Sequence, residues 1–237
     1  MVGRRILDLE NRKILKVERR GKTILLHLSG DRILGFHQKM SGKILLSPRD
    51  FKDEHIRSRF RLSSGLDLIF HDVRKFGRVW SGPTAKILKE KYFSKLGFDP
   101  LEIGFAKFKK LLSGHSGMIK PLLLRQDVLA GVGNIIADES LWRAKIHPRR
   151  KVESFREKDF KNLYHALRFI LKKSIRLGGT TMRDWLHPDR SEGRYWKACL
   201  VYRRAGEKCS RCGGIIKRTV VGSRGTFICE KCQRPLR

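Results

Sequence analysis

The stretch that decides the fold is Cys209-Ser210-Arg211-Cys212, followed after sixteen residues by Cys229-Glu230-Lys231-Cys232. Two such pairs can supply four thiolates to a tetrahedral zinc ion, because each pair binds from a tight turn and the intervening chain returns as a hairpin. β-favouring runs flank Gly222-Ser223-Arg224-Gly225 and fit the two hairpin strands. The sequence therefore predicts a small module held by one structural Zn²⁺, with Arg224 at its hairpin tip.

Two disulfides are the alternative interpretation of these four cysteines. No signal peptide supports export to an oxidising compartment, where disulfides would form. A fifth cysteine, Cys199, would also be left unpaired. Zinc is therefore the preferred interpretation.

The charge of the chain indicates its partner. Its 237 residues include 54 Lys and Arg against 23 Asp and Glu, which gives a net charge of +31. Such an excess is typical of proteins that bind polyanions, and nucleic acid is the first candidate. A membrane surface is the alternative, but the sequence has no apolar run of spanning length and no separate basic amphipathic anchor.

The pattern of the chain changes near residue 84. Between residues 13 and 80, short β-favouring runs are separated by Gly- and Ser-rich turns, a spacing that predicts a sandwich or barrel-like half. After Thr84 longer helical patterns follow, and the clearest runs from about Phe155 to Ile175 and ends at Gly178-Gly179. The length allows about two domains.

A glycine-rich turn, Gly131-Val132-Gly133, precedes a predicted helix that begins near Asn134. Asn134 can serve as the N-cap of this helix. The free N–H groups and the dipole of a helix N-terminus favour an anion, so this turn is a candidate phosphate site. Glycines that only pack two helices together would explain the pattern equally well.

The segment from Gly131 to Leu141, with Ile146-His147-Pro148 behind it, closely resembles the helix-two-turn-helix signature of the formamidopyrimidine-DNA glycosylase and endonuclease VIII family. The zinc hairpin falls where that family has its own. The resemblance continues through other motifs in the same order, and it is stronger to the formamidopyrimidine type. These motifs are Arg19-Arg20-Gly21-Lys22, Met40-Ser41-Gly42, Asp72 to Gly77, Ile119-Lys120-Pro121, Gly178-Gly179-Thr180-Thr181 and Val201-Tyr202.

The resemblance implies an α+β fold in three parts. These are a partial, N-terminally incomplete β-sandwich over residues 1–98, a helix-two-turn-helix domain over 99–205, and a zinc finger over 206–237. It also implies a base-excision-repair glycosylase with abasic-site lyase activity on oxidised purines. The expected partner is duplex DNA with damaged bases or abasic sites, bound by a monomer in the cytoplasm at the nucleoid, with no membrane partner.

The resemblance also implies roles for single residues on the DNA backbone. Asn134 and Lys120 are similar to the pair that clamps the phosphates beside the damaged nucleotide. Arg224 resembles a phosphate-gripping arginine implicated in the second elimination, and Lys22 a lysine that assists the first. His55 and His115 stand where the family has further backbone contacts.

Three more residues resemble the group that fills the space left by an extruded base. Met40, Arg74 and Phe76 match this group, with the arginine facing the orphaned cytosine and the phenylalanine wedging into the stack. Met40 and Phe76 could alternatively belong to the core. The choice of lesion is expected to depend on the loop that follows Thr181.

Members of this family begin, after the initiator methionine, with Pro-Glu, whose proline amine attacks the sugar. This chain begins Met1-Val2-Gly3-Arg4-Arg5, and its first proline is Pro48. One interpretation is that the recorded start is incomplete and the natural protein is a bifunctional glycosylase. The other is a DNA-binding remnant that recognises damage without cutting, with weak lyase activity through the amine of Val2 or Lys22.

Overall fold

The computed structural model describes residues 9–182 and 186–235. The chain divides into two compact units, one formed by Met1–Ser94 and Leu177–Trp196, the other by Lys95–Arg176 and Lys197–Arg237. The three domain ranges expected from the sequence stay a prediction.

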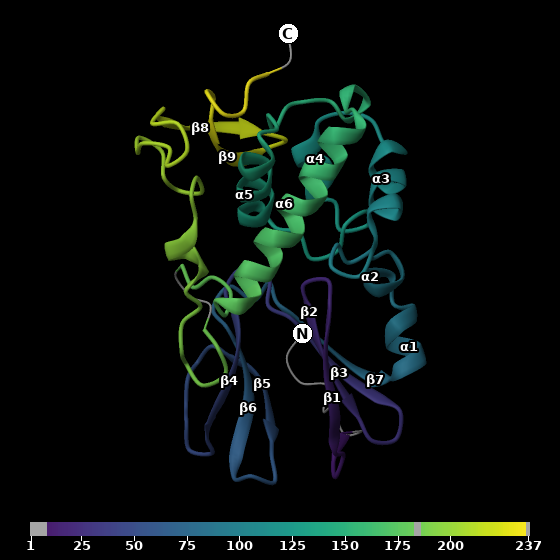
Figure 1. The fold of residues 1–237 in the computed structure, drawn as a ribbon. Helices are drawn as coiled ribbons and strands as arrows, with labels where there is room; N and C mark the ends of the chain where they lie inside the picture. The colour runs from purple at the N-terminus through teal and green to yellow at the C-terminus, as the bar shows by residue number, and fades with distance from the viewer. Residues whose placement is uncertain (1–8, 183–185, 236–237) are drawn as a thin grey trace. The chain divides into compact units, whose positions relative to one another are not determined.

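The first unit is a β-sandwich of two antiparallel sheets (Figure 1). One sheet has the order β1-β2-β3-β7 and the other the order β4-β6-β5. The strands are β1 Ile14–Arg20, β2 Thr23–Leu28, β3 Arg32–His37, β4 Gly42–Pro48, β5 Ile56–Arg61, β6 Leu66–Asp72 and β7 Arg78–Pro83. Two short helices, α1 Thr84–Lys89 and α2 Lys91–Ser94, follow β7. The predicted sandwich is confirmed.

Both sheets contribute to the core of the sandwich. Phe36 on β3 lies 5.7 Å from Phe70 on β6 between ring centroids, and Leu26, Leu34 and Ile44 pack around them. Alternate residues of these strands point inward, as the β-favouring runs of the sequence indicate. The apolar interior fixes the register of each strand and therefore the positions of the loops at the strand ends.

The second unit is mainly helical (Figure 1). Its helices are α3 Phe105–Ser113, α4 Ile119–Leu124, α5 Asn134–Ala144 and α6 Glu157–Arg176, and its hairpin strands are β8 Ile216–Val221 and β9 Arg224–Cys229. Two short 3₁₀ turns are η2 Val152–Ser154 and η3 Tyr195–Ala198, the second at the division between the units. The long helix expected from Phe155 to Ile175 is confirmed as α6.

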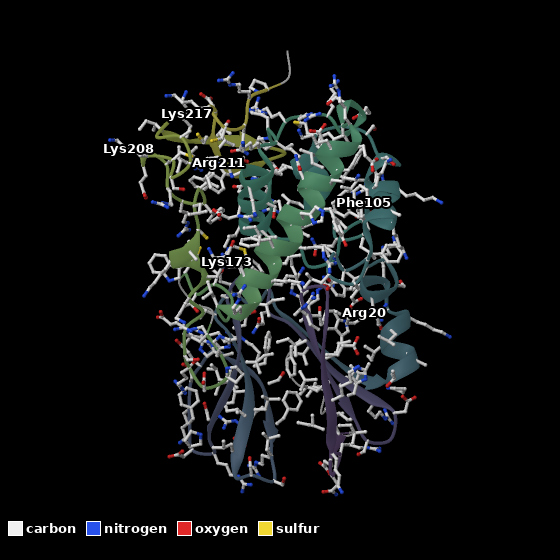
Figure 2. All side chains as sticks on the ribbon, in the orientation of Figure 1. Arg20, Phe105, Lys173, Lys208, Arg211 and Lys217 are labelled. Carbon is white, nitrogen blue, oxygen red and sulfur yellow. The ribbon has the colours of Figure 1, made fainter. Side chains whose placement is uncertain are left out.

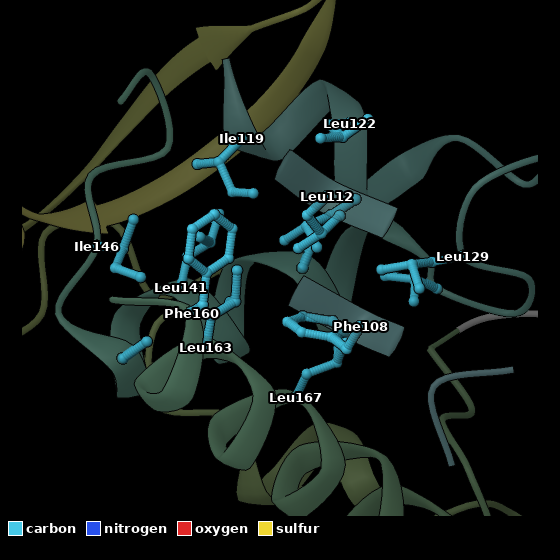
Figure 3. Close-up of a cluster of buried hydrophobic side chains, with 14 of the residues drawn as sticks. Phe108, Leu112, Ile119, Leu122, Leu129, Leu141, Ile146, Phe160, Leu163 and Leu167 are labelled. Atoms are coloured by element: carbon cyan, nitrogen blue, oxygen red, sulfur yellow. The ribbon is translucent and has the colours of Figure 1, made fainter. Parts of the chain in front are cut away.

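The core of the second unit brings four helices together (Figure 3). Phe108 and Leu112 of α3 meet Ile119 of α4, Leu141 of α5 and the apolar stripe of α6. The stripe includes Phe160, Leu163 and Leu167, all at most 4% exposed. The aromatic and leucine stripe of α6 is therefore core. Within the described residues, no helix is both long and apolar enough to cross a membrane.

Candidate nucleic-acid interface and zinc site

The four cysteines of the two Cys-x-x-Cys pairs converge at one end of the β8–β9 hairpin. Their sulfur atoms all lie within 4.8 Å of one another, and none forms a disulfide. The Sγ atoms of Cys212 and Cys229 are 3.4 Å apart, and those of Cys209 and Cys232 are 3.9 Å apart. Four sulfurs at about 2.3 Å from a tetrahedral zinc ion would lie about 3.8 Å apart. The donor set and its spacing fit a structural Zn²⁺.

The thiols of the cluster differ: burial and the neighbouring thiols raise the pKa of Cys232 to about 12, and Cys209 is the thiol whose pKa is lowered. Burial raises its pKa, but N–H donors, the backbone of Arg211 among them, outweigh burial and lower the pKa to about 6. A thiolate is the form that binds zinc. Cys199 lies outside this cluster, is buried, and has a pKa raised to about 12 by burial and by Glu139.

The zinc module packs against helix α5. Trp142 of α5 forms an apolar cluster with Cys209, Ile216 and Phe227 of the module. The guanidinium of Arg211 covers the Trp142 ring at 3.9 Å and donates to the Trp142 carbonyl at 2.8 Å. The contacts of Trp142 and Arg211 join the metal site to the helix that begins at Asn134. Two further basic side chains of the module, Lys208 and Lys217, are exposed (Figure 2).

The hairpin of the module turns tightly at Gly222 and Ser223. Val221 pairs with Arg224 across the turn, and Gly222 and Ser223 have φ angles of 56° and 58°. Two successive positive φ angles are the pattern of a type I′ turn, which suits the twist of a hairpin. Arg224 is the first residue of β9 and is exposed. The predicted hairpin, with an arginine at its tip, is confirmed.

Helix α5 begins differently from the expectation. Its N-cap is Gly133, in an extended conformation and without a capping side chain, so the interpretation of Asn134 as N-cap is wrong. Instead, Asn134 Nδ2 donates to the carbonyl of Gly225 at 2.9 Å. Asn134 is thus the first residue of the helix, and its side chain is directed to the hairpin tip instead of capping the helix end. Gln126 braces the preceding turn, because it accepts from Gly131 N–H and donates to the Val132 carbonyl.

Lys120 lies in the interior of the second unit. Its Nζ is 2.6 Å from Asp138 Oδ1, and both side chains are 0% exposed. The same Nζ donates to Thr226 Oγ1 at 2.7 Å and to the Gly225 carbonyl at 3.1 Å. Burial raises the pKa of Asp138 to about 6 and lowers that of Lys120, and the opposite charge of each partner opposes these shifts.

Met40, Arg74 and Phe76 come together in the first unit. Arg74 Nη1 lies 3.6 Å from Met40 Sδ, and the guanidinium lies 4.8 Å from the centre of the Phe76 ring. Met40 is 66% exposed and Phe76 is 51% exposed, so the alternative that they are core residues is wrong. Large apolar side chains held in water are a mark of a binding surface.

Asp72, which the sequence analysis named only as part of a motif, holds this group in place. Its Oδ1 accepts from Ser41 Oγ at 2.5 Å and its Oδ2 accepts from Gly77 N–H at 2.7 Å. Ser41 Oγ in turn accepts from Arg74 N–H at 3.2 Å. A side chain at Gly77 would lie 2.4 Å from the Phe70 ring, so the turn needs glycine. One buried carboxylate therefore joins the Met40 loop to the Arg74–Phe76 loop.

Lys22 follows Gly21 in the turn between β1 and β2 and is exposed. The neighbouring strands bring His37 and Arg78 into register with Thr23. Burial, followed by the positive charges of Lys39 and Lys22, lowers the pKa of His37 from 6.5 to about 4. His37 is a residue that the sequence analysis missed, and its neutral ring lies among three cationic side chains.

The two predicted backbone-contact histidines lie at separate places. The backbone N–H of His55 donates to Asp53 Oδ1 at 2.7 Å in the first unit, and the His55 ring lies 5.6 Å from that of His71. His115 lies just after α3 in the second unit and is half-buried. Their DNA contacts stay predictions.

Two parts of the expected site lie outside the described residues. Residues 1–8 hold the chain start, and residues 183–185 belong to the loop after Thr181 that is expected to select the lesion. The base of this loop is described: Thr181 Oγ1 accepts from Gly193 N–H at 2.9 Å, and Thr181 N–H donates to the Gly193 carbonyl at 3.2 Å.

Three family models match the chain in succession. They are the formamidopyrimidine-DNA glycosylase N-terminal domain over residues 4–79, the formamidopyrimidine-DNA glycosylase H2TH domain over 96–185, and the zinc finger found in FPG and IleRS over 206–235. A formamidopyrimidine-DNA glycosylase of Pelotomaculum thermopropionicum is 40% identical over 229 residues, which cover 95% of this chain and 83% of the relative. The chain belongs to the formamidopyrimidine-DNA glycosylase family.

Solved structures agree with this assignment. The MutM (Fpg) protein of Thermus thermophilus is 38% identical with a TM-score of 0.86, covering 94% of this chain and 84% of that chain. The Lactococcus lactis Fpg in complex with abasic-site DNA is 34% identical with a TM-score of 0.89, covering 97% and 85%. The predicted family, the fold class and the zinc module are confirmed.

Proposed function

We propose that this protein is a DNA glycosylase and abasic-site lyase that removes oxidised purines from duplex DNA. The observation that carries the proposal is the exposed group of Met40, Arg74 and Phe76, held together by Asp72. An apolar wedge beside an arginine can enter a base stack and occupy the space of a base turned out of the duplex. Enzymes that act on a single base of a duplex must turn it out of the stack, and such a group can fill the space that it leaves.

The relatives support this choice of substrate. The Lactococcus lactis protein has been solved with DNA that contains an abasic site and, as a variant, with DNA that contains Fapy-dG, an opened oxidised purine. The net charge of +31 suits a polyanionic partner. These findings favour excision over the alternative of damage binding without cutting.

The roles proposed for single residues follow from their places. Arg224, at the hairpin tip, and the neighbouring Asn134 are proposed to serve the phosphates beside the lesion, and Lys120 supports them through Gly225. Lys22 is proposed to approach the lesion phosphate and to assist elimination. His55 and His115 are proposed as further backbone contacts.

The chemistry needs an amine that attacks the sugar carbon C1′ as the damaged base leaves. The amine then stands on C1′ in place of the base, and protonation of O4′ with cleavage of the C1′–O4′ bond opens the sugar to an iminium. Loss of a proton at C2′ of this iminium expels the 3′ phosphate. Borohydride reduces such an iminium to a stable amine and so fixes the protein to the DNA. Trapping therefore reports the nucleophile directly, and peptide mapping of the adduct identifies it.

The test is borohydride trapping on duplexes that carry 8-oxoguanine opposite cytosine or a preformed abasic site. An adduct on both duplexes is expected. An adduct on the abasic duplex alone would mean a lyase without base excision and would overturn the proposal. Tight binding without any adduct would instead identify a damage-binding protein. The Lys22→Met variant shows whether Lys22 contributes the trapped amine.

A further inference from the structure

A buried ion pair lies directly beneath the proposed phosphate-binding tip of the zinc hairpin. Lys120 of α4 and Asp138 of α5 are both 0% exposed, and Lys120 Nζ lies 2.6 Å from Asp138 Oδ1. A buried ion pair adds little to stability, because removing two charges from water costs about as much free energy as their attraction returns. The pair is therefore better explained by what it holds in place.

Each member of the pair binds the hairpin. Asp138 Oδ2 accepts from the backbone N–H of Phe227 at 3.1 Å. Lys120 Nζ donates to the Gly225 carbonyl at 3.1 Å and to Thr226 Oγ1 at 2.7 Å. Three consecutive residues of β9 are thus fixed from the helices α4 and α5.

Arg224 directly precedes these residues. The Gly225 carbonyl accepts from both Lys120 Nζ and Asn134 Nδ2, the second at 2.9 Å. The backbone that carries the Arg224 side chain is therefore held by two donors on one oxygen. Lys120 Nζ contacts Asp138 of α5 and Gly225 and Thr226 of the hairpin, and its side chain is 0% exposed.

We infer that Asp138 and Lys120 are positioning residues for Arg224: the pair fixes Gly225, Thr226 and Phe227 so that Arg224 meets the DNA phosphate in one orientation. This inference rests on the proposed function. In this role Lys120 acts through Gly225 and makes no phosphate contact of its own. Asp138, which the family resemblance did not single out, becomes part of the DNA-binding site.

The first experiment needs no DNA. The variant Lys120→Met with Asp138→Leu replaces the pair by apolar side chains of similar size, an exchange that buried ion pairs often tolerate. Hydrogen exchange at the Gly225, Thr226 and Phe227 amides is then compared with the wild type. Faster exchange at these amides, with the rest of the second unit unchanged, is expected. Unchanged exchange would overturn the inference, whatever the protein does with DNA.

The second experiment is a thermodynamic cycle with Arg224→Gln on an abasic duplex. The paired substitution should weaken binding about tenfold in the wild type and less than about twofold in the Arg224→Gln background. Equal losses in both backgrounds, with a further fall of about 0.9 in the salt slope, would mean that Lys120 contacts phosphate itself. That outcome would overturn the inference while leaving the proposed function intact.

A matched control is available just after the other end of α4. Arg125 and Asp127 form an exposed pair with Arg125 Nη2 2.6 Å from Asp127 Oδ2, and both side chains are about half exposed. The variant Arg125→Met with Asp127→Leu removes the same charges. Any change that this variant makes in the free energy of DNA binding should be the same in the wild type and in the Arg224→Gln background. If wild-type protein binds no damaged duplex, the proposed function fails, and the exchange measurement alone decides the inference.

Discussion

The guanidinium of Arg74 lies 4.8 Å from the centre of the Phe76 ring, and both side chains stand exposed at the end of the sandwich strands β6 and β7. A cation over a ring face is attracted by the ring quadrupole. This contact keeps the two side chains together before any partner binds. The pair is thereby organised in advance for an opened base stack.

Phe76→Ala should weaken binding to an abasic duplex more than binding to an undamaged duplex. Stacking of one aromatic side chain on a base contributes about 1–3 kcal/mol, so a loss of roughly 5- to 150-fold is expected for the abasic duplex. Titration of both duplexes by fluorescence anisotropy measures the difference.

Phe98→Ala is the control for this change. Phe98 is 43% exposed and has Lys107 Nζ 3.6 Å from its ring centre, so it has the same kind of cation contact. It should leave the discrimination between the two duplexes unchanged. Equal losses on both duplexes for Phe76→Ala would show that the ring does not read the lesion.

Removal of zinc should abolish tight DNA binding. The hairpin is too small to fold on its own apolar contacts, and zinc ligation supplies on the order of 10 kcal/mol to modules of this size. Without the metal, Arg224 would lose its place on β9. A chelator followed by an electrophoretic shift assay checks this, and added zinc should restore binding.

Cys212→Ser should behave like the chelator, whereas Cys199→Ser should not. Cys199 is buried outside the cluster of four sulfurs, so its loss removes no metal ligand. Full DNA binding by a metal-free protein, shown by metal analysis of the same sample, would contradict the structural role of zinc.

Much of the fold could be predicted because its signals are local. The seven sandwich strands lie within residues 14–83, close to the predicted β-rich range of 13–80, and the stripe of α6 recurs at helical spacing. The bounds of β1 are the hardest to predict, since most of its residues are exposed and show no alternation of burial. The zinc site was predicted because its four ligands are marked by spacing alone.

The organising contacts could not be predicted, because they join residues far apart in the chain. Ser41 and Asp72 are 31 residues apart, and nothing in either segment indicates that they meet. Asn134 was interpreted as an N-cap from its neighbours, but its amide binds Gly225, 91 residues away. A local pattern cannot show whether an asparagine will accept from its own helix end or donate to a carbonyl that tertiary packing brings near it.

His37 should make the stability of the protein depend on pH. Its pKa is about 4 in the folded protein against 6.5 ordinarily, owing to burial and then to Lys39, Lys22 and Arg78. Between these pH values the unfolded state binds a proton at His37 and the folded state does not. The free energy of unfolding is therefore highest above pH 6.5 and decreases as the pH falls toward 4. The difference corresponds to on the order of 3 kcal/mol.

Urea unfolding of the wild type and of His37→Asn at pH 7.5 and pH 5 measures this effect. An asparagine oxygen can still accept from Lys39 N–H, which lies 3.0 Å from His37 Nδ1. The variant should lose less stability than the wild type on acidification. His165→Asn, at an exposed position of α6, is the control and should follow the wild type. Parallel curves for His37→Asn and wild type would show that His37 does not titrate as described.

Gly222→Ala should destabilise the zinc hairpin more than Gly206→Ala. Both glycines have positive φ, 56° and 90°, so an added methyl group costs about 1 kcal/mol in each. At Gly222 the new Cβ would also lie 2.6 Å from Pro121 Cγ of α4, whereas nothing lies within 4 Å at Gly206. Overpacking of this kind adds about 1–3 kcal/mol.

Because Pro121 follows Lys120, the clash at Gly222→Ala should also speed hydrogen exchange at Gly225. Equal free energies of unfolding for the two variants would show that the hairpin turn does not press on α4.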